Sequence, residues 1–157
     1  MKSLLFSLAL LGLVPSGAQA APFTLSGDGQ EVTDQATGLI WRRCMEGMSW
    51  DGSTCSGSES TYTHEYALVR ARTEATASGK AWRLPNIREL SSIVDRSRAS
   101  PSIDPAAFPA TPLAFFWSSS PYAGDSDYAW YVFFDDGYVN GYARGGNYAV
   151  RLVRASQ

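Results

Sequence analysis

Short segments along the chain alternate hydrophobic and polar positions or, at 115–118, are mainly apolar, and these patterns predict strands. The segments that fit are residues 23–25, 31–34, 39–43, 81–84, 115–118, 129–134, 138–141 and 149–154. Asp136 and Gly137 separate two of them and are typical of a hairpin with a type I′ turn. Residues 46–61 are rich in Gly and Ser, which predicts a surface loop.

Two helices are predicted between these strands. Thr63 is a suitable N-cap and Gly79 a suitable C-cap for a helix over about 64–78. We expect its buried stripe to be formed by Tyr66 or Ala67, Val69, the stem of Arg70, Ala71 and Ala75. Asn86 and Glu89 have the spacing of a capping box at the start of a second helix, and a long irregular connection over 96–114 follows. Strands on both sides of two helices indicate an α+β domain with an antiparallel sheet.

The first twenty residues have the pattern of a secretion signal. Lys2 precedes an apolar run over 4–14 that is too short to span a bilayer, and residues 18–20 form an A-x-A cleavage site. We therefore expect cleavage between Ala20 and Ala21, a single mature domain over 21–157, and a periplasmic or secreted protein. The alternative is a short anchor that stays uncleaved. No later segment is long and apolar enough to predict membrane insertion.

Export changes the interpretation of the two cysteines. Cys44 and Cys55 are eleven positions apart, and in an oxidising compartment this pair predicts a structural disulfide. A metal pair or a reactive thiol is the alternative, but zinc would need about two further ligands, and His64 is the one histidine available.

Length, charge and composition then limit the function. A chain of 157 residues favours one domain, and a net charge of −2 argues against a nucleic-acid partner. Aromatic residues make up 13%, with five Trp and eight Tyr, which favours a binding module. We expect Trp41, Trp82, Trp117 and Trp130 to build the core. Arg83 and Arg88 are expected to be buried or helix-packing partners of carboxylates rather than ligand contacts.

Signals for catalysis are weak. The chain has no P-loop, G-x-S-x-G, H-E-x-x-H or C-x-x-C motif. A Ser-His-Asp arrangement would have to use His64 with Ser118, Ser119 or Ser120, and His64 is more simply an exposed residue in the first turn of a helix. We therefore expect no enzymatic activity and no cofactor. Calcium is the weaker possibility, with oxygen ligands from Asp125, Asp127, Asp135 and Asp136.

The candidate binding residues lie in residues 122–148, which contain six Tyr. Tyr beside Gly and Asn is the composition of adaptable contact surfaces, and aromatic rings with Arg also suit sugars. For Trp130, Tyr131 and Phe133 we expect core and hairpin packing. The residues expected to bind a ligand are Tyr138, Asn140, Tyr142, Arg144, Asn147 and Tyr148.

Five motifs in order resemble the Lcl C-terminal domain family over about residues 31–154. They are Asp34-x-x-Thr37-Gly38-Leu39-x-Trp41, Trp82-Arg83-Leu84-Pro85-Asn86 with Glu89-Leu90, Phe116-Trp117-Ser118-Ser119-Ser120, Ala129-Trp130-Tyr131-Val132-x-Phe134-x-x-Gly137 and Val150-Arg151-Leu152-Val153-Arg154. The resemblance implies a C-type-lectin-like fold, similar to that of formylglycine-generating enzymes, with a twisted antiparallel sheet, two helices and long loops. It also implies an exported bacterial module used in adhesion or ligand binding.

The C-terminal segment is also similar to the variable region of retroelement-diversified proteins, which share this fold. This resemblance implies exposed variable positions at Asp135, Asp136, Tyr138, Asn140, Gly141, Tyr142, Ala143, Arg144 and Asn147. Together the sequence predicts a module that recognises a glycan or a protein. The alternatives are an envelope or surface component that self-associates, or an enzyme of the formylglycine-generating-like fold.

Overall fold

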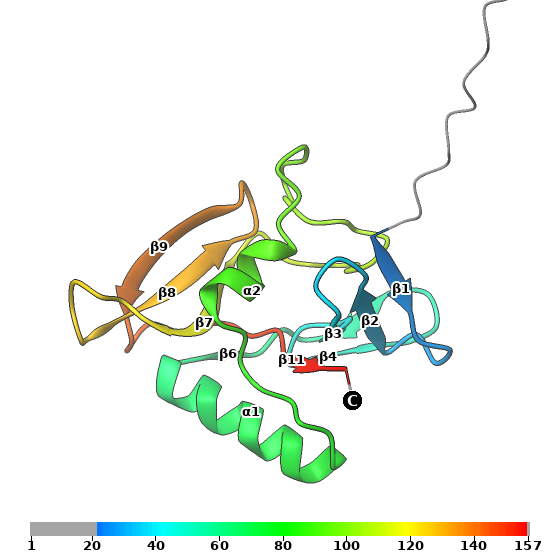
Figure 1. Ribbon diagram of the computed structural model, residues 1–157, viewed down its shortest axis with the longest axis horizontal. Coiled ribbons are helices and arrows are strands. Elements are labelled where there is room, and N and C mark those ends of the chain that lie inside the picture. The colour runs from blue at the N-terminus through cyan, green and yellow to red at the C-terminus, as the bar shows by residue number, and fades with distance from the viewer. Residues whose placement is uncertain (1–21, 157) are drawn as a thin grey trace, which may run out of the picture.

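Two sheets, two helices and a small hairpin make up the part of the chain that the structure, a computed structural model, describes, residues 22–156 (Figure 1). The predicted signal and its cleavage site at Ala20 and Ala21 lie outside these residues. Within 22–156 no helix is long and apolar enough to cross a membrane. The architecture confirms the α+β prediction and is consistent with a C-type-lectin-like fold.

The four-stranded sheet joins the beginning of the described chain to its end. Its order is β1-β2-β3-β11, with β1 at Phe23–Leu25, β2 at Glu31–Asp34, β3 at Leu39–Arg42 and β11 at Val153–Ala155. All its pairs are antiparallel, and Val153 lies opposite Trp41. Strands β2 and β3 therefore form the centre of this sheet, with β1 paired to β2 and the last strand, β11, paired to β3.

The five-stranded sheet carries the candidate site. Its order is β6-β10-β7-β8-β9, with β6 at Thr61–Tyr62, β10 at Tyr148–Ala149, β7 at Phe115–Pro121, β8 at Tyr128–Phe133 and β9 at Tyr138–Ala143. The pairing of β10 with β7 is parallel and the other pairs are antiparallel. Strand β9 is therefore an edge of this sheet, and the β8–β9 hairpin projects from the body of the molecule in Figure 1.

Helix α1, His64–Ser78, begins and ends where the caps predict. The Thr63 side chain accepts a hydrogen bond from Tyr66 N, and Gly79 adopts a left-handed φ of 67°. The predicted stripe is only partly right, because Tyr66 and Val69 are exposed, by 66% and 44%. His64, Ala67 and Ala71 are buried instead, on one side of the helix.

Helix α2, Ile87–Ser92, has the predicted capping box between Asn86 and Glu89. Both terminal nitrogens of Arg83 donate to the Glu89 carboxylate at 2.7 Å, which confirms the carboxylate partner expected for that arginine. Arg88 differs: it is exposed, and residues 22–156 provide no ion pair for it. An exposed arginine needs no partner, because water solvates its charge.

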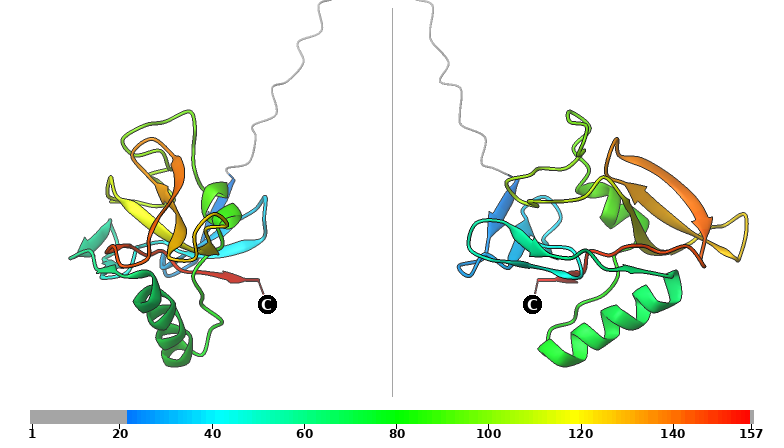
Figure 2. Two further views of the ribbon diagram at one scale, coloured as in Figure 1. Left: turned by 90° about the vertical axis from the view of Figure 1, so that its left-hand side faces the viewer. Right: turned by 180° about the vertical axis from the view of Figure 1, so that it is seen from behind.

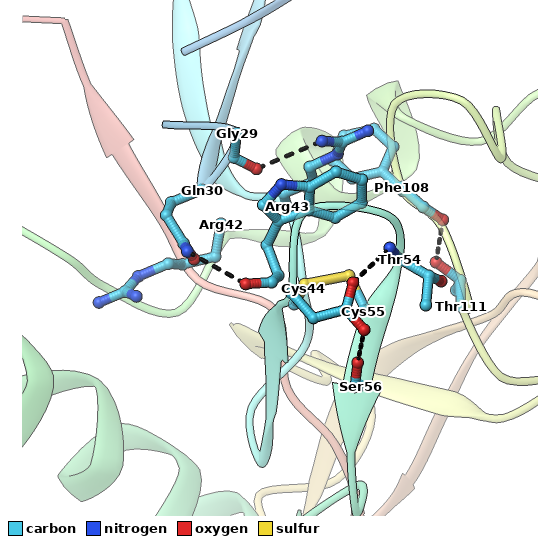
Figure 3. Close-up of a disulfide and its surroundings, with 12 residues drawn as sticks. Gly29, Gln30, Arg42, Arg43, Cys44, Thr54, Cys55, Ser56, Phe108 and Thr111 are labelled. Atoms are coloured by element: carbon cyan, nitrogen blue, oxygen red, sulfur yellow. Dashed lines mark hydrogen bonds between the residues drawn. A yellow bond between two sulfur atoms is a disulfide. The ribbon is translucent and has the colours of Figure 1, made fainter. Parts of the chain in front are cut away.

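The segment over 46–61 is not a loop, contrary to the prediction. It forms a hairpin of β4, Met48–Trp50, and β5, Cys55–Gly57, followed by β6. The predicted disulfide Cys44–Cys55 is present with a Cα–Cα distance of 5.5 Å (Figure 3). The guanidinium of Arg43 lies 3.6 Å from the centroid of the Trp50 ring. The disulfide and the stacking of Arg43 on Trp50 thus stabilise β4 and β5. Each of these strands has three residues, too few for a clear sequence pattern.

Three strand boundaries also differ from the prediction. Residues 81–84 make one bridge, Arg83 to Val153, because Pro85 ends the extended segment. Phe133 lies opposite Tyr138, so residues 134–137 form a four-residue connection rather than a two-residue type I′ turn. The predicted strand over 149–154 is split between β10 and β11. Residues 150–152 cross from one sheet to the other and are all buried, which hides the alternation expected of a strand.

Each helix contributes to one hydrophobic cluster against the sheets. Figure 2 shows the long helix α1 below the strands in both of its views. The first cluster places Leu90 and Ile93, from α2 and its C-cap, with Phe116 and Val132. The second places Ala67 and Ala71 of α1 with seven further buried side chains, which are Trp82, Leu84, Trp117, Ala129, Tyr131, Val150 and Leu152. Of the four tryptophans expected in the core, Trp41, Trp82 and Trp117 are buried. Trp130 is not, because it lies on the outer end of β8 and packs against the Tyr122 ring at 4.7 Å.

Candidate ligand-binding face

The register of the five-stranded sheet gathers aromatic side chains on one of its faces. Residues opposite each other on neighbouring strands point to the same side. Trp117 pairs with Tyr131 and Tyr131 with Asn140, while Phe115 pairs with Phe133. We call this side the aromatic face, formed by Phe115, Trp117, Tyr131, Phe133, Tyr138, Asn140, Tyr142 and Tyr148.

The two faces of the sheet are covered unequally. Phe116, Val132 and Val139 point to the opposite side and pack in the cluster beneath α2. On the aromatic face, α1 covers the end at Trp117, where the His64 ring lies edge-on at 5.4 Å. Beyond this end the face is open, and Tyr138 and Tyr142 are exposed by 52% and 49%.

The rings of the aromatic face form a connected layer. The Phe115 centroid lies 4.7, 4.6 and 5.0 Å from those of Tyr131, Phe133 and Tyr148. Tyr148 also packs at 4.5 Å on Trp117 and at 5.5 Å on Tyr142. These are distances at which edge-to-face and offset contacts are favourable. The exposed Tyr142 ring is therefore supported from below by the half-buried Tyr148, which itself packs on the buried Trp117.

Burial changes the titration of the hydroxyl groups in this layer. It raises the pKa of Tyr148 to about 12 and also raises the pKa of Tyr131. An ionised phenolate is disfavoured in an apolar layer because it loses hydration. Both side chains are therefore neutral at physiological pH and keep their hydroxyl protons.

Asn140 is held in one orientation between the two exposed tyrosines. Its Nδ2 donates to the Tyr138 hydroxyl at 2.8 Å, and its Oδ1 accepts from Gly141 N at 2.8 Å. The register makes the Gly141 N–H point away from β8, so the amide oxygen occupies an open hydrogen-bonding position on the edge of the sheet. The Tyr138 hydroxyl proton and the second Nδ2 proton remain available for a ligand.

Arg144 and Asn147 lie in the connection between β9 and β10 rather than on the face itself. Arg144 N donates to Asp127 O at 2.8 Å and Arg144 Nε donates to Tyr128 O at 3.2 Å. The arginine borders a hollow of about 480 Å³ at the start of α1, and Asn147 is exposed. The structure thus groups Tyr142, Tyr148 and Arg144 at one end of β9 and Tyr138 with Asn140 toward the other.

The four aspartates proposed for calcium do not converge. Asp125 and Asp127 lie on the loop before β8, and Asp135 and Asp136 lie on the loop after it, about 20 Å away along a six-residue strand. Asp125 and Asp136 accept hydrogen bonds from the backbone of their own turns, at 2.9 Å. Within residues 22–156 no group of three or more His, Cys, Asp or Glu side chains could hold a metal ion.

Gly141 is one of the positions that the resemblance to variable regions implies, but the structure leaves no space for a larger side chain there. A Cβ atom on Gly141 would lie 2.3 Å from Cδ2 of Tyr122, whose ring covers this glycine. Side chains larger than hydrogen would displace that ring. Of the nine positions that this resemblance implies to be exposed, Asp136, Tyr138, Tyr142 and Asn147 are exposed. The other five, Asp135, Asn140, Gly141, Ala143 and Arg144, are only partly exposed.

Sequence reasoning missed two features of this region. Phe115, Tyr131 and Phe133 support the aromatic face, but only the register of β7 with β8 shows it. His64 was expected to be exposed and is 2% exposed. The signal was present, because His64 precedes Ala67 and Ala71 by three and seven positions and so shares their stripe.

The fold and this face define a class of protein: an α+β protein with a C-type-lectin-like arrangement and an open aromatic face. A comparison with protein families matches the Lcl C-terminal domain over residues 30–154. The chain belongs to the Lcl C-terminal domain family. A search of curated proteins finds no match to it.

Proposed function

We propose that this protein is an exported binding module that recognises a carbohydrate chain on its aromatic face, without making or breaking covalent bonds. One observation carries the proposal: two half-exposed tyrosines flank a fixed asparagine on one side of an edge strand. Export is supported by the signal pattern over residues 1–20 and is compatible with the disulfide Cys44–Cys55.

Recognition would combine stacking with hydrogen bonding. The rings of Tyr138 and Tyr142 offer flat apolar surfaces, and the Asn140 amide offers a hydrogen-bond donor beside them. Because Tyr142 packs on Tyr148, and because Asn140 is hydrogen-bonded to the Tyr138 hydroxyl and to Gly141 N, binding orders little that was mobile. Little conformational entropy is therefore lost on binding, and even a small contact area on this face can provide affinity.

The spacing of the tyrosines indicates the size of the ligand. Tyr138 and Tyr142 are four residues apart on β9, which separates their Cα atoms by about 13 Å. One sugar ring cannot contact both side chains over this span. An oligosaccharide of several units can, and we expect affinity to increase with the length of the chain until both rings are occupied.

The test is a glycan-array screen of oxidised protein comprising residues 21–157, with calcium and again with EDTA. Tyr138→Ala and Tyr142→Ala should each weaken capture at least about tenfold, the loss typical of a contact residue at the centre of an interface. Tyr66→Ala is the matched control, because Tyr66 is 66% exposed on α1 and lies off the aromatic face. It should change affinity less than about twofold.

The other outcomes would reject parts of the proposal. Glycan capture that survives both face variants places the site elsewhere. Capture that disappears in EDTA points to a cation and to the aspartate loops. No glycan bound in either buffer rejects the carbohydrate proposal and leaves a protein ligand or self-association for the face.

A further inference from the structure

His64 connects the start of α1 to the connection between β9 and β10. Its ring Nε2 lies 2.9 Å from Ser118 O, and because a carbonyl only accepts, Nε2 carries the proton. The neutral ring then has a lone pair on Nδ1, which lies 3.4 Å from Arg144 Nη1. His64 N also donates to Arg144 O at 2.9 Å. Both the backbone and the side chain of His64 therefore contact Arg144.

The surroundings of the imidazole oppose a positive charge on it. The ring is 2% exposed and packs against Trp117, and β7 presents only the neutral Trp117 and Ser118 to it. The charged groups nearby are Arg144, from the β9–β10 connection, and Glu65, the next residue of α1. Glu65 is exposed, so water screens its attraction, whereas the guanidinium is in contact with the ring. Tyr148 from β10 is neutral.

We propose that His64 is a positioning residue for the aromatic face and makes it acid-sensitive: the neutral ring holds Arg144 and the residues up to Tyr148, and the protonated ring releases them. A proton on Nδ1 would point at the Arg144 guanidinium, so that a hydrogen-bond acceptor becomes a like-charged donor. Release of Arg144 would loosen the segment that leads to Tyr148, on which the Tyr142 ring packs. Loss of ligand under acid conditions rests on the proposed function, whereas the structural response does not.

The direction of titration agrees with this geometry. Burial, with a smaller effect from Arg144, lowers the pKa of His64 below its ordinary 6.5. A conformation that exposes the ring takes up its proton near pH 6.5, and the closed conformation only at lower pH. Below pH 6.5 the closed conformation therefore loses stability relative to the open one as the pH falls.

The structural test needs no ligand. As His64 is the one histidine in the chain, its ring ¹⁵N and ¹H resonances report its pKa without ambiguity. Hydrogen exchange of amides 144–148, corrected for the intrinsic rate, should show protection that falls at least fivefold between pH 7.5 and pH 5. The protection of the β3 amides, in the other sheet, should be the same at both pH values. His64→Gln retains a donor for Ser118 O but has no titrating group, so its protection should be independent of pH.

Affinity for a glycan identified on the array forms a second arm. Wild type should bind at least fivefold more weakly at pH 5 than at pH 7.5, and His64→Gln should show no such change. A His64 pKa at or above 6.5, or protection of amides 144–148 that is equal at both pH values, overturns the inference. If protection responds as expected and no glycan binds, the carbohydrate proposal fails while the role of His64 stands.

Discussion

Replacement of Arg151 by Met tests what holds the crossing between the two sheets. Arg151 is 1% exposed, and its Nη1 donates to Arg42 O at 3.1 Å and to Arg43 O. Its Nη2 donates to Thr111 Oγ1 at 2.8 Å, and its guanidinium lies 4.8 Å from the Phe108 ring centroid. Burial lowers the pKa of Arg151 to about 9, so the side chain is still charged at neutral pH. The cation is held by neutral acceptors and an aromatic ring.

Two large effects oppose each other in the Arg151→Met variant. Hydrogen bonds from a charged donor contribute about 1.5–3 kcal/mol each, so three contribute about 5–9 kcal/mol. Removal of a buried charge recovers several kcal/mol of desolvation. We expect the hydrogen bonds to dominate by about 3 kcal/mol, because Met leaves the Arg43 carbonyl and the Thr111 hydroxyl buried without this donor. In a domain of this size, that loss lowers Tm by about 10 °C.

Calorimetry at pH 7 measures this difference directly. Arg98→Met is the matched control, because Arg98 makes an ion pair with Asp95 on the surface and its side chain is 51% exposed. The control should change the free energy of unfolding by less than about 0.5 kcal/mol. A Tm for Arg151→Met equal to or above that of wild type would refute the reasoning. It would mean that desolvation of the guanidinium outweighs its three hydrogen bonds.

Two further predictions concern the hairpin of β4 and β5. Reduction of the disulfide Cys44–Cys55, which closes a loop of about twelve residues, should lower the free energy of unfolding by about 3 kcal/mol. Denaturant unfolding with and without reductant measures it, and coincident curves would contradict the estimate. Gly47→Ala should lower the free energy of unfolding by about 3 kcal/mol, because φ of Gly47 is 90° and the new Cβ would lie 2.3 Å from Ser58 O. Gly79→Ala has a left-handed φ but open space around the Cβ and should lower it by only about 1 kcal/mol; equal losses for the two variants would show that the clash is unimportant.

Local signals in the sequence predicted local structure well. Thr63, Gly79 and the capping box of Asn86 and Glu89 set both helix starts and the end of α1, because caps act within one turn of the chain. The disulfide followed from export chemistry and is confirmed. The hairpin over 48–57 was missed because its strands have three residues each. Its order depends on Trp50 contacting Arg43, a contact that no periodic pattern encodes.

The candidate site depends on longer-range information. Alternation along β9 places Tyr138, Asn140 and Tyr142 on one side, and sequence reasoning could select them. Which rings support them depends on the register of four strands. His64 shows the same limit. A first-turn histidine is exposed or buried according to how the helix docks, and the small Ala67 and Ala71 allow α1 to approach closely enough to bury it.

The difference between the two faces of the five-stranded sheet is what connects its packing to binding. Phe116 and Val132, on the side of α2, are fully buried and stabilise the fold. Tyr138 and Tyr142 are half exposed, so their outer surfaces contribute little to the free energy of folding. Tyr142 packs on Tyr148 below it, the Tyr138 hydroxyl accepts a hydrogen bond from Asn140, and both rings are open to solvent, so they are suited to a contact that is not made within residues 22–156. Removal of these two rings should therefore weaken ligand capture strongly while lowering Tm only slightly. A large decrease in Tm would identify them as structural residues.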